Sequence, residues 1–155
     1  MRFNENQAMV RTGSPTPQTV IFKSESHKLH QAFPVAKDES GKNKVIVPGQ
    51  PVMLNTDGTI EAYFGTGIYL GIAVNGSEYP VYPDGNLGSE VTVAVEGFMV
   101  VYGSASGEVA PGYVAPEKLD TDSQYVSYEA SETATNFIAM TAASEAGELI
   151  QVLVK

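Results

Sequence analysis

The chain has 155 residues, enough for one ordinary domain, and it contains no Cys, which excludes a disulfide framework, a thiol nucleophile and thiolate metal sites. Only 17% of the residues are charged, and the 15 Gly and 9 Pro give the composition of a β protein. The net charge of −9 argues against nucleic acid and anionic membranes as partners, since an acidic surface repels both.

The first 34 residues differ from the rest and predict an extended arm. They carry four bases and two acids, a charge of +2, whereas residues 35–155 carry five bases and sixteen acids, a charge of −11. Ordering 34 backbones opposes folding by roughly 34–68 kcal/mol, while burying the larger apolar side chains of this segment returns only about 12–24 kcal/mol. We therefore expect residues 1–34 to be an arm that orders only against a neighbouring surface. Residues 35–155 are expected to form a body that folds alone.

Short apolar runs alternate with turns from residue 35 onward. The first runs predict strands at 45–47 and 51–54, and Asp57-Gly58 predicts a tight hairpin turn before a returning strand at 59–64. A nearly continuous apolar strand follows at 68–74, and then a polar, Gly-rich loop. The next run alternates, with its valines on one face and Thr and Ala on the other, and a further strand comes after the break at Gly97. The apolar runs in this last part are 90–95 and 98–102.

The second half of the body repeats the first, so that the half-units cover about 45–97 and 98–155. The corresponding segments are 48–52 and 111–114, 59–63 and 125–128, 69–74 and 136–141, and 90–95 and 148–154. Such self-similarity at a fixed period predicts a duplicated β unit. The Ala-rich stretch 131–146 leaves one short helix open. The predicted fold is all-β, a small barrel, β-tulip or sandwich built from two loosely repeated units.

The patterns that could support catalysis or metal binding are weak. His27 and His30 lie three residues apart, but no acid or third ligand completes a site. Asp84, Asn86 and Glu90 resemble the oxygen ligands of a calcium loop without its spacing to a bidentate Glu. No Ser lies in a nucleophile elbow. We expect no catalytic residue, no metal site and no cofactor.

The body contains all eight tyrosines of the chain. Tyr is favoured at protein interfaces because it combines a large apolar ring with a polar tip. Tyr79 and Tyr82 lie in a loop with Pro80 and Pro83, which makes them the best candidates for exposed surface contacts.

The N-terminus lacks the apolar core of a secretory signal. The longest unbroken apolar run, Phe98–Tyr102, is far shorter than the ~20 residues of a membrane helix. We expect a protein that is made in the cytoplasm and does not enter a membrane.

The segment PGQPVMLNTDGTIEAYFGTGIYLGIA, at 48–73, resembles the family of small tailed-phage capsid decoration (cement) proteins, and the likeness extends over about 45–155. The matching positions of the first copy are Gly49, Pro51, Val52, Asp57-Gly58, Gly71-Ile72-Ala73, Val91, Val93, Val95 and Gly97. The second copy matches through Gly112, Glu148, Val152 and Val154, and it departs from the pattern at Ile138-Ala139-Met140-Thr141.

This resemblance implies a β-barrel or β-tulip protein on the outer surface of the phage head, made in the host cytoplasm and often trimeric, with an N-terminal arm that reaches across capsid subunits. The expected function is non-enzymatic cementing of the major capsid protein. Val20, Ile21, Phe22 and Phe33 are the predicted anchors of the arm. The chain has no fibre repeat, which favours decoration over the base of a head fibre.

Two other functions remain open from the residues. One is a virion-surface module that binds host structures or glycans through Tyr79 and Tyr82. The other is a small trimeric β-fold enzyme such as a nucleotide hydrolase, although no Arg follows Arg11 to bind phosphates.

Overall fold

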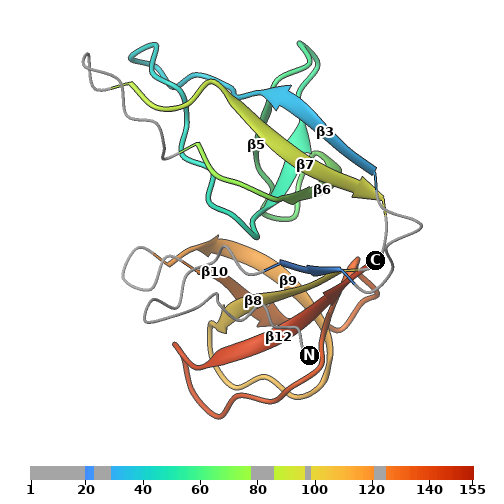
Figure 1. Cartoon of the computed structure of the whole chain (residues 1–155). Helices are drawn as coiled ribbons and strands as arrows, with labels where there is room; N and C mark the ends of the chain where they lie inside the picture. Colours follow the sequence, from blue (N-terminus) through green and yellow to red (C-terminus); the bar gives the residue numbers. More distant parts are fainter. Residues whose placement is uncertain (1–19, 23–28, 78–85, 97–98, 121–124) are drawn as a thin grey trace.

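The computed structural model describes residues 20–22, 29–77, 86–96, 99–120 and 125–155. In these ranges the chain forms strands, turns and loops, and no helix is present. The strands make two sheets in two lobes, one above the other in Figure 1. The all-β prediction is confirmed, whereas the short helix left open at 131–146 is not formed, because a strand and turns occupy that stretch.

The upper lobe in Figure 1, which we call unit 1, is a five-stranded sheet in the order β3-β7-β6-β4-β5. Its strands are β3 (Leu29–Pro34), β4 (Pro51–Leu54), β5 (Ile60–Ala62), β6 (Ile68–Ala73) and β7 (Glu90–Glu96). The β4–β5 hairpin turns at Asp57-Gly58 as predicted, with Gly58 at a φ of 86° that L side chains rarely adopt. A parallel bridge between Val35 and Ile60 joins the two ends of the sheet.

The lower lobe, unit 2, is a closed five-stranded barrel with one added strand. Its strands are β8 (Met99–Ala105), β9 (Gly112–Leu119), β10 (Val126–Ala130), β11 (Phe137–Ala139) and β12 (Leu149–Val154). The sheet runs β10-β9-β11-β12-β8, and a parallel pairing of β10 with the end of β8 closes it. The added strand is β2 (Val20–Phe22), which pairs with the start of β8.

The two units have the same strand order, so the predicted duplication is confirmed. In each unit the first strand pairs antiparallel with the fifth, and its end makes a parallel contact with the third. Backbone hydrogen bonds of 2.8–2.9 Å recur at matching places in the two units. In unit 1 they run from the N–H to the carbonyl oxygen of Val35–Ser89, Ala36–Ile60, Val74–Thr92 and Ser77–Ile46. Their counterparts in unit 2, in the same order, are Ala105–Glu148, Ser106–Tyr128, Met140–Gln151 and Ala143–Val109.

This correspondence pairs β3 with β8, and it places β3 inside unit 1. Composition alone assigns residues 29–34 to the arm and predicts that the first half-unit begins near residue 45, whereas the structure pairs β3 with β7 of unit 1. The strand is exposed at all positions except Phe33, which is half-buried, so it lacks the alternating apolar pattern that would have identified it. Its antiparallel pairing with β7 holds it in the sheet.

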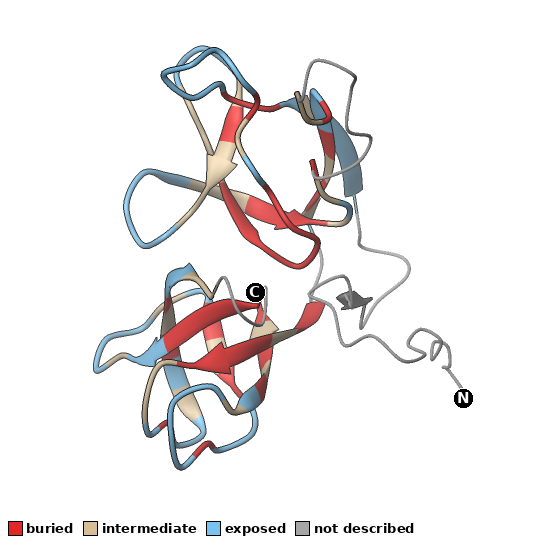
Figure 2. Cartoon of the chain, turned by 90° about the vertical axis from the view of Figure 1, so that its left-hand side faces the viewer, coloured by how far each residue is buried: buried red, intermediate tan, exposed pale blue. Residues whose placement is uncertain are grey.

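The core consists of two hydrophobic clusters, and one of them is shared between the units. One fills unit 1 and includes Val91 and Val93, as the alternation of that strand predicted. The other fills unit 2 and extends into unit 1 through Ile72 and Ala94, which point away from the interior of their own unit. Figure 2 shows buried segments concentrated in the strands of both lobes and exposed segments concentrated in the loops.

Aromatic rings join the units at the shared cluster. The ring of Phe137 in unit 2 lies 6.4 Å from that of Tyr63 and 5.4 Å from that of Tyr69, both of unit 1, and 5.8 Å from Tyr128 of its own unit. Edge-on and tilted aromatic pairs at such distances stabilise a contact beyond the area that they bury. The two units therefore form one hydrophobic body rather than two independent domains.

Candidate binding site

Three of the four predicted arm anchors lie on the edge of unit 2. In β2, Val20 stands opposite Val101, Ile21 opposite Val100 and Phe22 opposite Met99. The same edge of β8 receives β10 further along, at Ser104 and Ala105. A three-residue segment of the predicted arm can therefore bind a sheet edge through backbone pairing.

The fourth anchor and the two loop tyrosines have other positions. Phe33 lies in β3 opposite Val91, is half-buried, and packs against the cluster of unit 1. Its ring therefore holds β3 to its own unit. Tyr79 and Tyr82 lie outside the described residues.

The matching strands β3 and β8 differ in their pairing and burial. Six of the seven residues of β8 are buried. Within the described ranges, the only strand paired with β3 is β7, and five of the six residues of β3 are exposed. Edges of this kind can accept an added strand.

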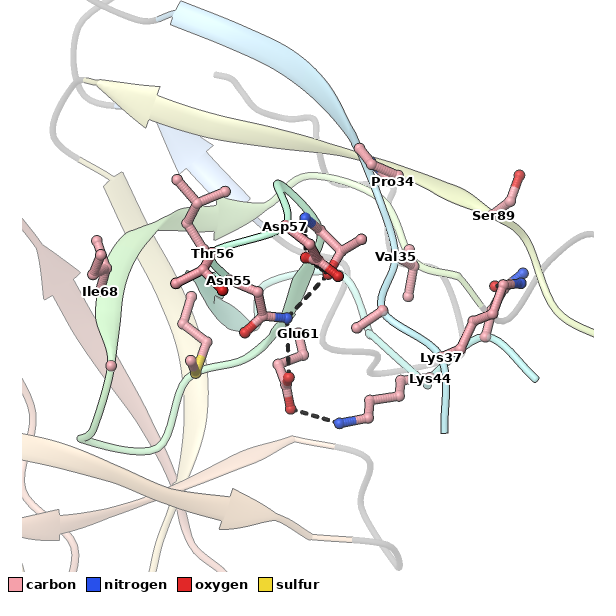
Figure 3. A pocket seen from close by; sticks show the side chains of 16 residues that line it. Pro34, Val35, Lys37, Lys44, Asn55, Thr56, Asp57, Glu61, Ile68 and Ser89 are labelled. Atoms are coloured by element: carbon pink, nitrogen blue, oxygen red, sulfur yellow. Dashed lines mark hydrogen bonds and ion pairs between the residues drawn. The ribbon is translucent and has the colours of Figure 1, made fainter. Parts of the chain in front are cut away.

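An open groove of about 880 Å³ lies on unit 1 beside the point where β3 ends (Figure 3). Its apolar wall includes Val35, Leu54 and Ile68, and its polar wall includes Lys44 and Glu61. Ile68 is 64% exposed, which makes it the most exposed large apolar side chain among the described residues. The groove thus combines an uncovered apolar side chain with charged groups.

Two of the charged groups of the groove form an ion pair. Lys44 Nζ lies 2.7 Å from Glu61 Oε2, and Asn55 Nδ2 donates to Glu61 Oε1 at 3.1 Å (Figure 3). The hydrogen bond from Lys44 and then that from Asn55 lower the pKa of Glu61, against an opposing effect of burial. The hydroxyl and the backbone N–H of Thr59 both donate to Asp57 Oδ1 and lower the pKa of Asp57. Both carboxylates are therefore stabilised in the ionised form.

This arrangement does not favour general acid catalysis by Asp57 or Glu61. A general acid needs a carboxyl group whose pKa is raised toward the working pH, and the environment of Glu61 and Asp57 acts in the opposite direction. Within the described ranges, no group of three or more His, Cys, Asp or Glu could hold a metal ion. The same ranges contain no helix that is long and apolar enough to cross a membrane.

The sequence did not identify this groove, because its members come together only in the fold. Lys44 and Glu61 are 17 residues apart and lie on different segments. Their segments are connected through Ala36, whose N–H donates to Ile60 O and whose carbonyl oxygen accepts the N–H of Lys44. No local motif records that contact.

The chain was compared with protein families, curated proteins and solved structures. No curated protein and no solved structure matches it. One family model matches residues 21–155 and is described as structural cement protein (E217 gp24/Pam3 gp6). This match covers well over half of the chain and both of its units, and the chain therefore belongs to the family of phage structural cement proteins.

Proposed function

We propose that the protein binds the outer surface of the phage head and cements neighbouring major capsid protein subunits through the segment that precedes β3. Membership of the cement family is the observation that carries this proposal, since it makes a capsid component the partner. The pairing of Val20–Phe22 with β8 supports the mode of binding, because it shows an arm segment adding to a sheet edge.

In this proposal the four anchors have two different roles. Phe33 packs against unit 1, so in this proposal it fixes the root of the arm. Val20, Ile21 and Phe22 supply the contact that is exchanged. In the free protein their backbone groups pair with β8, and on the head the same groups pair with a strand edge of the capsid protein. Three such arms in a homotrimer would raise the effective concentration of each arm at its site. The activity is structural and requires no catalysis.

A truncation tests the arm. A variant that begins at residue 23 lacks β2 and keeps β3, so unit 1 retains its full sheet. We expect its occupancy on purified heads that lack the protein to fall at least tenfold below that of the full chain. Circular dichroism checks that both proteins contain the same strand content. Equal occupancy of the two proteins would refute the arm mechanism.

A further inference from the structure

The outward side of the unit 2 sheet carries a row of apolar side chains. Cross-strand pairing places Tyr113, Ile138 and Leu153 side by side on β9, β11 and β12. Each of them alternates with a buried neighbour of the interior cluster, Val114, Phe137 and Val154. The row therefore points away from the barrel.

A second row lies beside the first. Gln151 pairs with Tyr102 of β8 and accepts the backbone N–H of Met140, and Leu149 precedes Gln151 by two residues on the same side of β12. Tyr113, Met140 and Leu149 are 41%, 38% and 47% exposed. The outer face of unit 2 is the name we give to Tyr102, Tyr113, Ile138, Met140, Leu149 and Leu153. None of these six residues is charged.

Part of the matching face of unit 1 is covered, whereas Ala32 and Glu90, the counterparts of Tyr102 and Leu149, are exposed. By the repeated pairings, Ile72 corresponds to Ile138, Ala94 to Leu153 and Val74 to Met140. Ile72 and Ala94 are fully buried, and they belong to the cluster that fills unit 2. The middle of this strand face thus contacts the other β unit of the chain in one repeat, whereas its counterpart in unit 2 leaves Met140 38% exposed.

We propose that the outer face of unit 2 binds a second copy of this chain and forms the contact between the subunits of the homo-oligomer. The covered face of unit 1 shows that a β unit of this chain can bury the equivalent surface. Two copies that each carry −9 repel one another over most of their surfaces, so self-association requires a contact face without charges, and the six residues of the outer face carry none. Contiguous apolar surface of this kind is typical of protein–protein contacts. The inference rests on the homo-oligomer proposed above and assigns its interface.

Association of the full-length chain in solution tests the inference. Sedimentation is measured over a concentration series for the wild type, for Met140→Asp and for Leu149→Asp. Both positions are exposed, so an added carboxylate leaves the barrel intact and places a charge in the contact. We expect the wild type to associate and each variant to weaken association at least tenfold. Val45→Asp is the matched control, because Val45 is an apolar residue of unit 1 with 46% exposure.

The outcomes separate this inference from the cement function. A strictly monomeric wild type, or face variants that associate like the wild type, would overturn the inference, as would an equal loss of association in Val45→Asp. Occupancy on purified heads is read independently on the same proteins. If Met140→Asp and Leu149→Asp lose binding to heads while the wild type is monomeric in solution, the face belongs to the capsid contact and the self-association inference fails. If neither the wild type nor any of the variants binds heads, while the wild type still associates, the cement function is refuted and the self-association inference stands.

Discussion

Tyr128 stands out at the scale of single residues. It is fully buried, and its hydroxyl has no hydrogen-bond partner among the described residues. Burial raises the pKa of the phenol, in agreement with an apolar setting. Its ring fits only because Gly103 lies beside it: a Cβ at that position would lie 2.5 Å from two ring carbons. The ring of Tyr128 therefore stabilises the fold through packing, whereas its buried hydroxyl opposes folding because it gives up hydrogen bonds to water.

Removing that hydroxyl tests this view. A buried hydroxyl without a partner disfavours the folded state by about 1–3 kcal/mol. We expect Tyr128→Phe to leave the free energy of unfolding unchanged or to raise it by about 1 kcal/mol, whereas Tyr128→Ala lowers it by about 3–5 kcal/mol because a cavity remains. Denaturant titration measures both variants. A loss above about 1 kcal/mol in Tyr128→Phe would mean that the hydroxyl is hydrogen-bonded in the folded protein.

Glu61 gives a prediction for the dependence of stability on pH. Its pKa is lowered in the folded protein, chiefly by Lys44, from an ordinary value of 4.5. A carboxyl group with a lowered folded pKa stabilises the protein above its unfolded pKa, and this contribution disappears as the pH falls through the folded pKa. We expect Glu61→Gln to be less stable than the wild type at pH 7, by under about 1 kcal/mol since the pair is partly exposed. The difference should vanish below the folded pKa.

The measurement is denaturant unfolding of both proteins at pH 7 and pH 3. Glu129→Gln is the control, since Glu129 is exposed in unit 2 and lies outside the groove. A difference between wild type and Glu61→Gln that persists unchanged at pH 3 would show that the amide alters packing rather than charge.

At the scale of the strands, β2 and β3 differ in how much the sheet that they join depends on them. Unit 2 closes through β10, so its barrel is complete without β2. Unit 1 has no such reserve, because β3 is the only described strand that pairs with one edge of β7, the other being taken by β6. Loss of β3 therefore exposes the buried strand β7, whereas loss of β2 exposes only the start of β8.

Two truncations make this contrast measurable. A chain that begins at residue 23 should unfold within about 1 kcal/mol of the full chain, because it loses only the short pairing of β2. A chain that begins at residue 35 should lose several kcal/mol, since Phe33 and the whole β3–β7 pairing are removed. Thermal unfolding compares the two chains with the wild type. Equal stability of the two truncated chains would show that β3 adds nothing to unit 1.

This second truncation also tests the expectation from the sequence that residues 35–155 fold alone as a body. The β runs of the body could be predicted because alternating valines and the Asp57-Gly58 turn are local signals. The exposed residues of β3 carry no such signal, and their strand arises from pairing with β7, about 60 residues away. The Ala-rich stretch at 131–146 shows the same limit, since tertiary pairing placed β11 where local propensity left a helix open.

The sequence predicts only those parts of the candidate binding surfaces that have a local signal. Val20–Phe22 could be found because three apolar β-formers stand in a polar arm. The structure places them in β2, and their contact with the capsid stays a prediction. The groove and the outer face of unit 2 depend on contacts between distant strands. One sequence without the fold does not reveal which apolar side of β12 points outward.

Cohesion of the two units is the main question at the scale of the whole molecule. The cluster that fills unit 2 includes Ile72 and Ala94 of unit 1, and Phe137 contacts rings of both units. A shared core couples the stability of two units, because unfolding of one exposes apolar surface of the other. A cement protein that bridges subunits would benefit from this, since a stiff body transmits tension between its contacts. The wild type is therefore expected to unfold in a single transition.

Phe137→Ala tests the coupling. Removing this ring deletes two aromatic contacts at the joint and one inside unit 2, and should lower the free energy of unfolding by about 3–5 kcal/mol. Differential scanning calorimetry should then show the single wild-type transition split into two, or a calorimetric enthalpy that exceeds the van't Hoff value. Val91→Ala is the control, because Val91 is fully buried in the cluster of unit 1 and lies away from the joint. It should lower the transition temperature and keep one transition. Two transitions already present in the wild type would mean that the aromatic joint does not couple the units.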